Sequence, residues 1–560
     1  MATKMNRRIL PKWILAACVV IVFFLLGVGA GFSDKYFEIA KSMDIFGRSY
    51  KEINKVYVDE TDPTQLMRTA IDAMLINMDP YTNYFGENEI EDAKFYQAGQ
   101  YSGIGIKLVK KADTLIIRDI QKKGPADRAG LKIGDKLLKV GDNSVLGLKA
   151  EEAMELLSGE SGSKVNIETI KLSDASRETH SIPREFESSR NVPYTHMAEN
   201  HIGYIMLTGF DQDAGFEVYN ACKKLRAEDP NLEGIILDLR GNPGGRVDEA
   251  VNITNAFLPK GENIVEMRGR TAETQRIWTT RQDPVDTDIP LAVLVNRSSA
   301  SASEIVSGAM QDLDRGVVIG ERSFGKGLVQ NVKPLSFNTQ LKITIAKYYT
   351  PSGRCIQAID YSSRNEDGSV GKIADSLKQS FTTKNGRVVY DGGGIEPDIK
   401  ISNMKYQAVT QALLNQGLIF DFASYFSQNR VTIAEAEGFS ISDSLYEAFV
   451  AYVNSKDFYF DTKSDQAIDE WEESLYNLDY QSEVEDEIST LRTKLQQLKK
   501  QDLQQHKKEI VRVIRAEIIK RYYYQEGVWK ASFTDDPVVL NAISVLQDQE
   551  TYQKILSGKG

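Results

Sequence analysis

The strongest constraint on the fold is a set of continuous apolar runs of strand length in the middle of the chain. Two of them, Gly234–Leu237 and Leu291–Val295, lack the polar–apolar alternation of a half-exposed strand. A third, Ile202–Leu207, is followed by a helical pattern over Gly215–Ala227. Such runs are typical of parallel strands that are buried on both faces, and strands separated by helices favour an α/β arrangement. We therefore expect an α/β core over residues 186–404.

The length of the chain calls for several domains. Single hydrophobic cores stop growing well below the 560 residues present here. Apolar residues at helical spacing predict a helical region over residues 36–95. Residues 405–560 are helical and polar in character, and Glu483–Lys508 is dense in Glu, Lys, Gln and Leu. We find no catalytic motif in residues 405–560, whose role stays open among clamping substrate, mediating oligomerisation and covering the core.

A membrane segment is predicted at the N-terminus. Trp13–Phe32 contains no charged residue, and a helix of this length spans about 30 Å, the thickness of a bilayer core. Basic residues precede this segment and Asp34 follows it, which predicts a cytoplasmic N-terminus. We therefore expect residues 1–35 to form an uncleaved membrane anchor. A signal peptide cleaved near Gly27–Gly31 is the alternative.

Charge and the scarcity of metal-binding side chains argue against several function classes. The net charge of −11 disfavours a nucleic-acid-binding protein, which would carry a basic face. The three cysteines, Cys18, Cys222 and Cys355, offer neither a disulfide framework nor a cluster of metal ligands. None of the four histidines lies between residues 202 and 505. No metal or cofactor is therefore predicted, and a nucleophilic serine in this interval would need a base other than imidazole.

The sequence of residues 96–185 predicts short strands separated by glycine turns. The pattern P-A-x-x-A-G-L-x-x-G-D, from Pro125 to Asp135, lies at the centre of this region. This order of elements resembles a PDZ domain in the permuted arrangement of bacterial proteases. The resemblance implies that Gly103, Ile104 and Gly105 form the loop that binds a peptide's terminal carboxylate through backbone N–H groups. The peptide would then add as a strand to the sheet edge. A plain tight turn at the two glycines is the alternative.

The apolar strand Leu291–Val295 leads into a serine-rich segment, in which Ser301 stands at the start of a helical run. Its small neighbours, Ala300 and Ala302, leave room for a substrate backbone. The start of a helix also offers free N–H groups and positive potential to a developing oxyanion. A structural role is the alternative, because Ser301 and Glu304 have the spacing of a capping box. The residues alone leave both roles open.

Lys326 lies between two glycines, which suits a semi-buried site where backbones approach closely. A serine hydroxyl is a weak nucleophile without an adjacent base, and a lysine can supply one when burial leaves its amine neutral. Gln330, four residues on, could orient that amine by hydrogen bonding, and an ordinary polar residue of a strand is the alternative. A solvated surface lysine is one alternative. A phosphate-binding loop is the other, but it would need a hydroxyl side chain where Gly327 stands.

Three segments together resemble the carboxy-terminal processing proteases, also called tail-specific proteases. They are S-A-S-A-S-E at residues 299–304, F-G-K-G at residues 324–327 and D-L-R-G-N-P-G-G at residues 238–245. With weaker matches the resemblance covers roughly residues 40–400. It implies a multidomain chain with a crotonase-like α/β protease core, an inserted PDZ domain, an N-terminal helical segment and a helical C-terminal region.

The same resemblance implies roles for individual residues. Ser301 would be the nucleophile and Lys326 the general base, with Gln330 in an assisting position. The oxyanion hole would use the N–H of Ala302 and that of a glycine in the third segment. Gly244 is the first choice for that glycine and Gly245 the second.

One position departs from the family pattern. Many members carry an arginine late in the PDZ domain that couples peptide binding to the active site, and Ser158 stands at its place here. The expectation is a serine endopeptidase of the bacterial inner membrane that faces the periplasm and captures the C-termini of protein substrates. A catalytically inactive PDZ adaptor is the alternative. Homo-oligomerisation and a regulatory adaptor partner both stay open.

Overall fold

The computed structural model describes residues 35–87, 89–90, 102–186, 190–361, 364, 370–402, 405–428, 430–476 and 481–558. The chain forms two compact units, residues 1–84 and residues 85–560. The predicted membrane segment lies outside the described residues. Among the helices that are described, none has the length and apolar character needed to cross a bilayer.

The first unit is helical where it is described. Residues 35–56 form one helix, and Pro63–Leu75 forms α2. Asp62 caps α2, because its carboxylate accepts hydrogen bonds from the N–H groups of Thr64 and Gln65. A short strand, β1 (Asn83–Phe85), begins at the end of this unit.

The predicted PDZ domain is built on an antiparallel sheet of order β2-β3-β4-β6-β7, with β5 paired to β4. One face of this sheet packs on α5, and the buried residues form a single hydrophobic cluster. The elements are β2 (Ile106–Lys111), β3 (Thr114–Ile120), α4 (Pro125–Arg128), β4 (Lys136–Val140), β5 (Asn143–Ser144), α5 (Ala150–Leu157), β6 (Lys164–Ile170) and β7 (Arg177–Pro183).

The predicted α/β core contains a six-stranded sheet of order β19-β14-β13-β10-β9-β8, in which only the pairing of β8 with β9 is antiparallel. Its strands are β8 (Tyr194–Ala198), β9 (Ile202–Met206), β10 (Gly234–Asp238), β13 (Leu291–Val295), β14 (Val317–Gly320) and β19 (Ile399–Lys400). The helices of the core are α6 (Ala214–Glu228), α7 (Val247–Asn255) and α8 (Ala302–Asp312), with single turns η1 (Glu199–His201), η2 (Ala272–Thr274) and η3 (Asp375–Leu377). The predicted α/β core is confirmed.

Both faces of the six-stranded sheet are buried, as the uninterrupted apolar runs predict. Ile235 and Leu237 point into the cluster formed with α6, α7 and α8, whereas Ile236 points into a second cluster on the opposite face. Further strands lie outside this sheet: β11 (Asn263–Gly269), β12 (Arg276–Thr279), β15 (Leu328–Pro334) and β16 (Gln340–Tyr349) form an antiparallel sheet, and β17 (Ser380–Thr382) pairs with β18 (Val388–Tyr390).

The parallel register brings two loops together at one edge of the sheet. Asp238, the last residue of β10, is the partner of Leu294 near the end of β13. The loop after β10 and the segment after β13 therefore leave the sheet side by side. This edge is where ligands bind in open α/β sheets, and it carries both the glycine-rich segment and Ser301.

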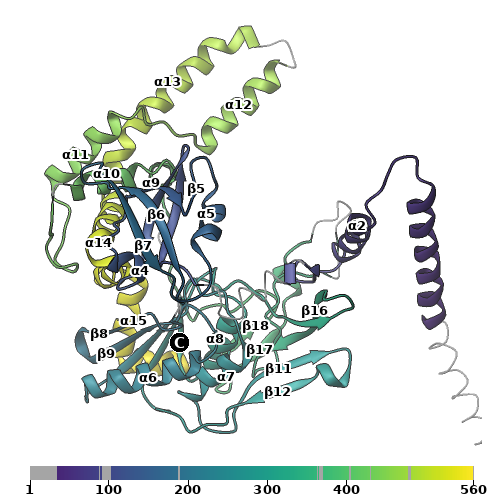
Figure 1. The fold of residues 1–560 in the computed structure, drawn as a ribbon. Coiled ribbons are helices and arrows are strands. Elements are labelled where there is room, and N and C mark those ends of the chain that lie inside the picture. The colour runs from purple at the N-terminus through teal and green to yellow at the C-terminus, as the bar shows by residue number, and fades with distance from the viewer. Residues whose placement is uncertain are drawn as a thin grey trace, which may run out of the picture. The chain divides into compact units, whose positions relative to one another are not determined.

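The C-terminal region divides between two packing partners. The helices α9, α10, α11, α13 and α14 share a hydrophobic cluster of their own, whereas α15 and α16 cover the second face of the six-stranded sheet. The helix α14 contacts the predicted PDZ domain at β3, where Lys520 pairs with Asp119, and the chain then turns into α15 (Figure 1). The bounds are α9 (Ala408–Asn415), α10 (Leu418–Gln428), α11 (Asp443–Asn454), α12 (Lys463–Tyr476), α13 (Gln481–Gln505), α14 (Lys507–Ser532), α15 (Pro537–Gln547) and α16 (Gln549–Leu556).

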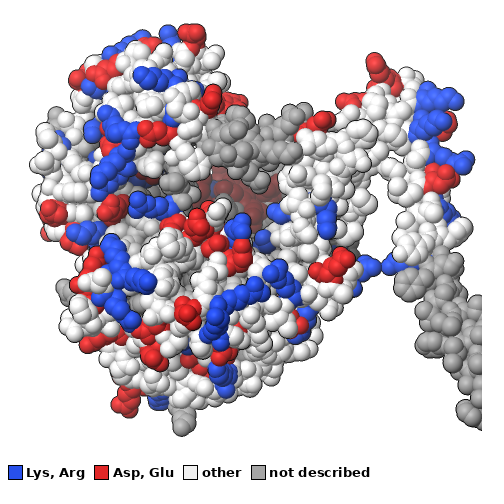
Figure 2. All heavy atoms as spheres, turned by 60° about the horizontal axis from the view of Figure 1, so that its bottom comes forward, with Lys and Arg blue, Asp and Glu red and all other residues white. Residues whose placement is uncertain are grey.

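Charged side chains of both signs are mixed over the face drawn in Figure 2, where Lys and Arg stand between Asp and Glu. Neither sign is gathered in one place on this face. Mixed surface charge of this kind favours solubility.

The PDZ core is completed by a residue of the C-terminal region. Phe420 of α10 is 7% exposed and belongs to the PDZ hydrophobic cluster. Two guanidinium groups lie near its ring, with Arg118 at 4.8 Å and Arg521 at 4.6 Å from the ring centre. The PDZ domain is therefore packed against α10 and α14 through apolar and cation–π contacts.

Replacing Phe420 by alanine is expected to destabilise the PDZ domain by about 3 kcal/mol, since a large buried ring is removed and a cavity is left. Hydrogen exchange of the amides in β3 and β4 would measure this loss in the full chain. Phe216→Ala, at a side chain of α6 that is 65% exposed, is the control and should change stability by less than about 0.5 kcal/mol. Equal exchange rates in the two variants would contradict the contribution of Phe420.

Candidate active site

Ser301 occupies a strained position between β13 and α8. Its backbone angles are φ 55° and ψ −110°, a combination that a residue with a Cβ rarely adopts. Strained backbone of this kind costs on the order of 1–3 kcal/mol and is concentrated at functional sites, where the surrounding structure holds it. The residue is 8% exposed and immediately precedes the first turn of α8.

The hydroxyl of Ser301 is not used to cap α8. The N–H of Glu304 donates to the backbone carbonyl of Ser301 at 2.9 Å, and no hydrogen bond from the side chain of Ser301 caps the helix. The other half of the predicted capping box is formed, because Glu304 Oε2 accepts a hydrogen bond from the Ser301 N–H at 2.8 Å. Capping therefore accounts for Glu304 and leaves the Ser301 hydroxyl available for another role.

Glu304 joins the segments of Ser301 and Lys326. Its Oε2 accepts hydrogen bonds from the N–H of Ser301 at 2.8 Å and from the N–H of Lys326 at 2.9 Å. Its Oε1 accepts from the Ser323 hydroxyl at 2.5 Å and from the Gly325 N–H at 2.7 Å. Because one oxygen atom binds both backbones, Ser301 and Lys326 are neighbours across 25 positions of sequence.

The Glu304 side chain is fully buried. Burial raises the pKa of its carboxyl group above the ordinary value, and the hydrogen bonds donated by Ser323 and by three backbone N–H groups oppose that rise. The sequence suggested only a capping role for Glu304. The capping-box spacing was a signal for part of its function, but the contacts with residues 323–326 depend on tertiary structure.

The two glycines around Lys326 are required by close contacts. A Cβ on Gly325, whose φ is 88°, would lie 2.3 Å from the Cβ of Ala358. A Cβ on Gly327 would lie 2.8 Å from the backbone nitrogen of Gln357, and the Gly327 N–H donates to Gln357 Oε1 at 2.8 Å. The loop is thus fixed on both sides of Lys326, whose side chain is half-buried.

The glycine-rich segment after β10 lies against Ser301. A Cβ on Gly244, whose φ is 98°, would be 2.7 Å from the carbonyl oxygen of Ala300 and 2.9 Å from the Ala302 nitrogen. It would also be 2.9 Å from the Cβ of Ser301. The backbone of this segment adds to the contact, since the carbonyl oxygen of Asn242 accepts hydrogen bonds from the Ala300 N–H and the Ser303 hydroxyl.

The N–H groups near Ser301 differ in how they are used. The Gly244 N–H donates to Asn242 Oδ1 at 2.9 Å. Within the part of the chain that the structure describes, the N–H groups of Ala302 and Gly245 have no hydrogen-bond acceptor. Two backbone donors are therefore available beside Ser301, and they come from the start of α8 and from the glycine-rich segment.

Gln330 lies on β15, in the strand that follows the Lys326 loop. Its amide nitrogen donates to Thr344 Oγ1 on the neighbouring strand β16 at 3.2 Å. The structure therefore assigns this side chain a cross-strand contact, and its predicted assistance to Lys326 stays a prediction.

Asp238 and Arg240 connect the glycine-rich segment to the protein interior. The Tyr204 hydroxyl donates to Asp238 Oδ2 at 2.7 Å, and Arg240 donates to both oxygens of the same carboxylate. Burial disfavours the charge of Arg240, but the neighbouring carboxylates of Asp238 and Asp536 outweigh that effect and raise its pKa. These charged residues thus serve to hold the loop, a role that sequence reasoning did not assign to them.

A groove of about 460 Å³ lies between β2 and α5 of the PDZ domain. Gly103, Ile104 and Gly105 line one end of it. The Gly103 N–H donates to the carbonyl of Glu185 at 3.1 Å, whereas the N–H groups of Ile104 and Gly105 have no acceptor among the described residues. Of the three predicted carboxylate-binding residues, two therefore offer a free donor in this structure.

Ser158 lines the same groove at the end of α5. Its hydroxyl donates to the carbonyl of Met154, so it is bonded within its own helix. The guanidinium group at this end of α5 comes from Arg184, which donates to the carbonyls of Leu156 and Leu157 at 3.2 and 2.8 Å.

No group of His, Cys, Asp and Glu side chains within the described ranges could hold a metal ion. The candidate site thus consists of a strained serine, a lysine loop bound to the same carboxylate, and two backbone N–H donors. This arrangement can activate a hydroxyl and stabilise an oxyanion.

Three family models match the chain. Peptidase family S41 matches residues 201–362, a PDZ domain matches residues 116–171, and the C-terminal helical domain of a probable PDZ-protease matches residues 409–546. The S41 match spans the segments of Gly244, Ser301 and Lys326, which the geometry brings together.

Curated proteins similar in sequence to this chain are named carboxy-terminal processing proteases. A carboxy-terminal-processing protease of Bartonella bacilliformis is 34% identical over 328 residues, which cover 58% of this chain and 74% of the relative. The carboxy-terminal processing protease CtpA of Bacillus subtilis is 32% identical over 318 residues, covering 56% of this chain and 66% of the relative. Among solved structures, the photosystem II D1 C-terminal processing protease is 23% identical, with a TM-score of 0.35 and coverage of 64% of this chain and 92% of the other.

Proposed function

This chain belongs to peptidase family S41, the carboxy-terminal processing proteases, and on that basis we propose that it hydrolyses protein substrates with Ser301 as nucleophile and Lys326 as general base. The observation that supports the proposal most strongly is the carboxylate of Glu304, which binds the backbone N–H groups of both residues. A nucleophile and a base have to be held within reach of each other, and this shared contact supports such an arrangement.

In the proposed reaction the neutral amine of Lys326 accepts the proton of the Ser301 hydroxyl while the oxygen attacks the peptide carbonyl carbon. The carbonyl π-electrons move to the oxygen, which becomes an oxyanion. When the carbonyl re-forms, the C–N bond breaks, and the Lys326 ammonium donates its proton to the leaving amine. Water then attacks the acyl-enzyme with Lys326 again accepting a proton, and the acid product leaves as Ser301 regains its hydrogen.

The proposed oxyanion hole uses the N–H groups of Ala302 and Gly245. Both donors are free of other described acceptors, and the Ala302 group lies at the N-terminus of α8, where the helix dipole is positive. Gly244, the first choice from sequence, is the less favourable donor because its N–H is bonded to Asn242. Its contribution would be to let the two backbones approach, since it lies against Ser301 without a side chain.

The PDZ groove is proposed to hold the C-terminal residues of the substrate. The free N–H groups of Ile104 and Gly105 support binding of a terminal carboxylate, and the exposed edge of β2 supports addition of the peptide as a strand. Gln330 is proposed to steady the Lys326 loop from β15.

Covalent labelling tests this proposal directly. A fluorophosphonate probe should react once per chain, at Ser301, and the labelled protein should no longer cleave an unfolded protein substrate. A chain that binds C-terminal peptides in the PDZ groove but neither reacts with the probe nor cleaves would be a PDZ adaptor instead. Labelling at a serine other than Ser301, with loss of activity, would contradict the assignment of the nucleophile.

A further inference from the structure

Among the described contacts, the C-terminal helical region reaches Arg240, next to the candidate active site, through the side chain of Asp536. This residue lies at the corner between α14 and α15 and caps α15, because its carboxylate accepts hydrogen bonds from the N–H groups of Val538 and Val539 at 2.9 and 3.3 Å. The same carboxylate forms an ion pair with Arg240 Nη1 at 2.9 Å. The two residues are 296 positions apart in the sequence.

Arg240 directly precedes residues 241–245, which contain the three glycines of the segment after β10. It is 15% exposed and lies between two carboxylates, Asp238 on one side and Asp536 on the other. A mostly buried ion pair is costly to break, because the remaining charge has no compensation. Asp536 therefore restrains Arg240 from the side of the guanidinium that Asp238 does not occupy.

A shift of Arg240 would be transmitted to the catalytic serine over a short stretch of chain. Residues 241–245 follow it directly, and within them Asn242 binds Ala300 and Ser303, while Gly244 lies against Ser301. The proposed oxyanion donor Gly245 is the last residue of this stretch. Small displacements of catalytic groups lower rates strongly, by about 100-fold for an error of 1 Å.

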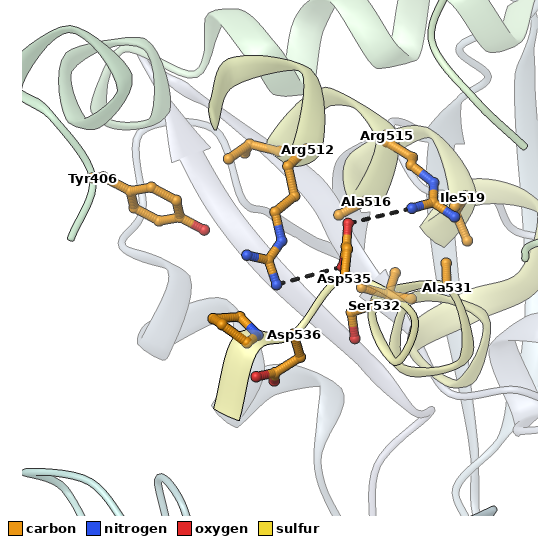
Figure 3. A pocket seen from close by; sticks show the side chains of 12 residues that line it. Tyr406, Arg512, Arg515, Ala516, Ile519, Ala531, Ser532, Asp535 and Asp536 are labelled. Atoms are coloured by element: carbon orange, nitrogen blue, oxygen red, sulfur yellow. Dashed lines mark hydrogen bonds and ion pairs between the residues drawn. The ribbon is translucent and has the colours of Figure 1, made fainter. Parts of the chain in front are cut away.

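The corner that carries Asp536 is itself held in place. The preceding residue, Asp535, lies between Arg512 and Arg515 of α14, with nitrogen–oxygen distances of 3.6 and 3.5 Å, as Figure 3 shows. Arg515 also donates to the carbonyl of Phe439 at 2.7 Å. The adjacent carboxylates thus have separate partners, since Asp535 binds the C-terminal helices and Asp536 binds the protease core. A cavity of about 400 Å³ lies beside this corner.

We propose that Asp536 is a positioning residue for the hydrolysis, through which the C-terminal helical region holds the loop that carries the Gly245 oxyanion donor. The inference rests on the proposed function. It assigns a task to a region in which the sequence shows no catalytic motif.

The helix α14, which ends shortly before Asp536, also contacts the PDZ domain. Lys520 of α14 pairs with Asp119 at 2.9 Å, Glu526 pairs with Lys122 at 2.8 Å, and the Tyr524 hydroxyl donates to Asp127. Tyr524 has φ 58° and ψ −167°, so the helix breaks at the residue that binds the PDZ domain. Residues 517–536 therefore link the substrate-binding domain with the Arg240 loop.

Asp536→Asn separates the two contacts of this side chain. Asparagine is as good an N-cap as aspartate, so α15 should keep its cap while the charge that pairs with Arg240 is lost. Asp548→Asn is the matched control, because Asp548 caps the next helix, α16, through the Thr551 N–H at 3.0 Å and has no arginine partner among its described contacts. Asp536→Glu keeps the charge and is the conservative variant.

We expect Asp536→Asn to lower kcat for a C-terminal peptide substrate by about tenfold or more, with KM and the Kd of the PDZ groove for the product peptide changed less than twofold. Fluorophosphonate labelling of Ser301 should slow to a similar extent, Asp536→Glu should recover part of the rate, and Asp548→Asn should match the wild type. A kcat of Asp536→Asn equal to that of the control would overturn the role of Asp536 while the protease assignment stands. The role of Asp536 would also be overturned if a lower thermal midpoint of Asp536→Asn accounted for the whole loss of kcat. A wild-type chain without labelling or cleavage would overturn both.

Discussion

Replacing Lys326 by alanine is expected to lower kcat for peptide hydrolysis by about 10⁴-fold or more, and Ser301→Ala should have an equally large effect. When a nucleophile and its base act as a unit, removal of either leaves only the contributions of binding and of the oxyanion hole. Both variants should keep the thermal midpoint of the wild type, because the Glu304 contacts use the backbone N–H groups of these residues rather than their side chains.

Lys326→Arg distinguishes a base from a positive charge. Arginine keeps the charge but is not deprotonated in proteins, so this variant should be as inactive as Lys326→Ala. The wild-type rate should also depend on pH in a defined direction. A protonated amine cannot accept the Ser301 proton, so kcat/KM should rise with pH until the base is fully neutral. An active Lys326→Arg variant, or a rate that is flat from about pH 5 to 9, would argue against the general base.

Replacing Glu304 by leucine is expected to have the second-largest effect, because four buried donors would lose their acceptor at once. Each unsatisfied buried donor costs about 1–3 kcal/mol, so we expect loss of several kcal/mol in stability and activity below detection. Glu304→Gln should be milder. Its amide oxygen can serve the N–H groups of Ser301 and Lys326 while its NH₂ faces Ser323 and Gly325, which leaves the Gly325 N–H without an acceptor.

Glu249→Gln provides the comparison for that variant. Glu249 is also a buried carboxylate, and its Oε2 accepts a hydrogen bond from the Gly215 N–H at 2.7 Å, between α7 and α6. Both glutamine variants should lower the denaturant midpoint, but only Glu304→Gln should lower kcat, by about 100-fold, at temperatures where the chain is fully folded. A fall in kcat of the same size in both would show that Glu304 contributes to stability alone.

Much of the fold could be predicted from sequence because its signals are local. The uninterrupted apolar runs at residues 234–237 and 291–295 predicted strands buried on both faces, and the pattern of residues 125–135 predicted the PDZ domain through its resemblance to that family. The juxtaposition of Ser301 with the lysine loop was predicted only through resemblance to a family. Nothing in a spacing of 25 residues requires two segments to meet.

The features that sequence reasoning missed are set by tertiary contacts. The capping-box pattern identified the bond from Glu304 to Ser301 but not the three bonds to residues 323–326. The choice between Gly244 and Gly245 as oxyanion donor depends on which of their N–H groups is bonded to the side-chain oxygen of Asn242. The conformational propensities of the residues do not determine that. The pair of Arg240 with Asp536 joins two family segments that are matched separately.

The helices that cover the second face of the six-stranded sheet have a practical consequence for work with this protein. Ile236, Leu294 and Ile319 are covered by α15 and α16. Both helices lie in the sequence well after residue 362, where the peptidase match ends. A recombinant fragment that ends at residue 362 would expose this hydrophobic face to solvent and to other copies of the fragment, and it would be prone to aggregate. A catalytic fragment that keeps this face covered therefore has to include α15 and α16.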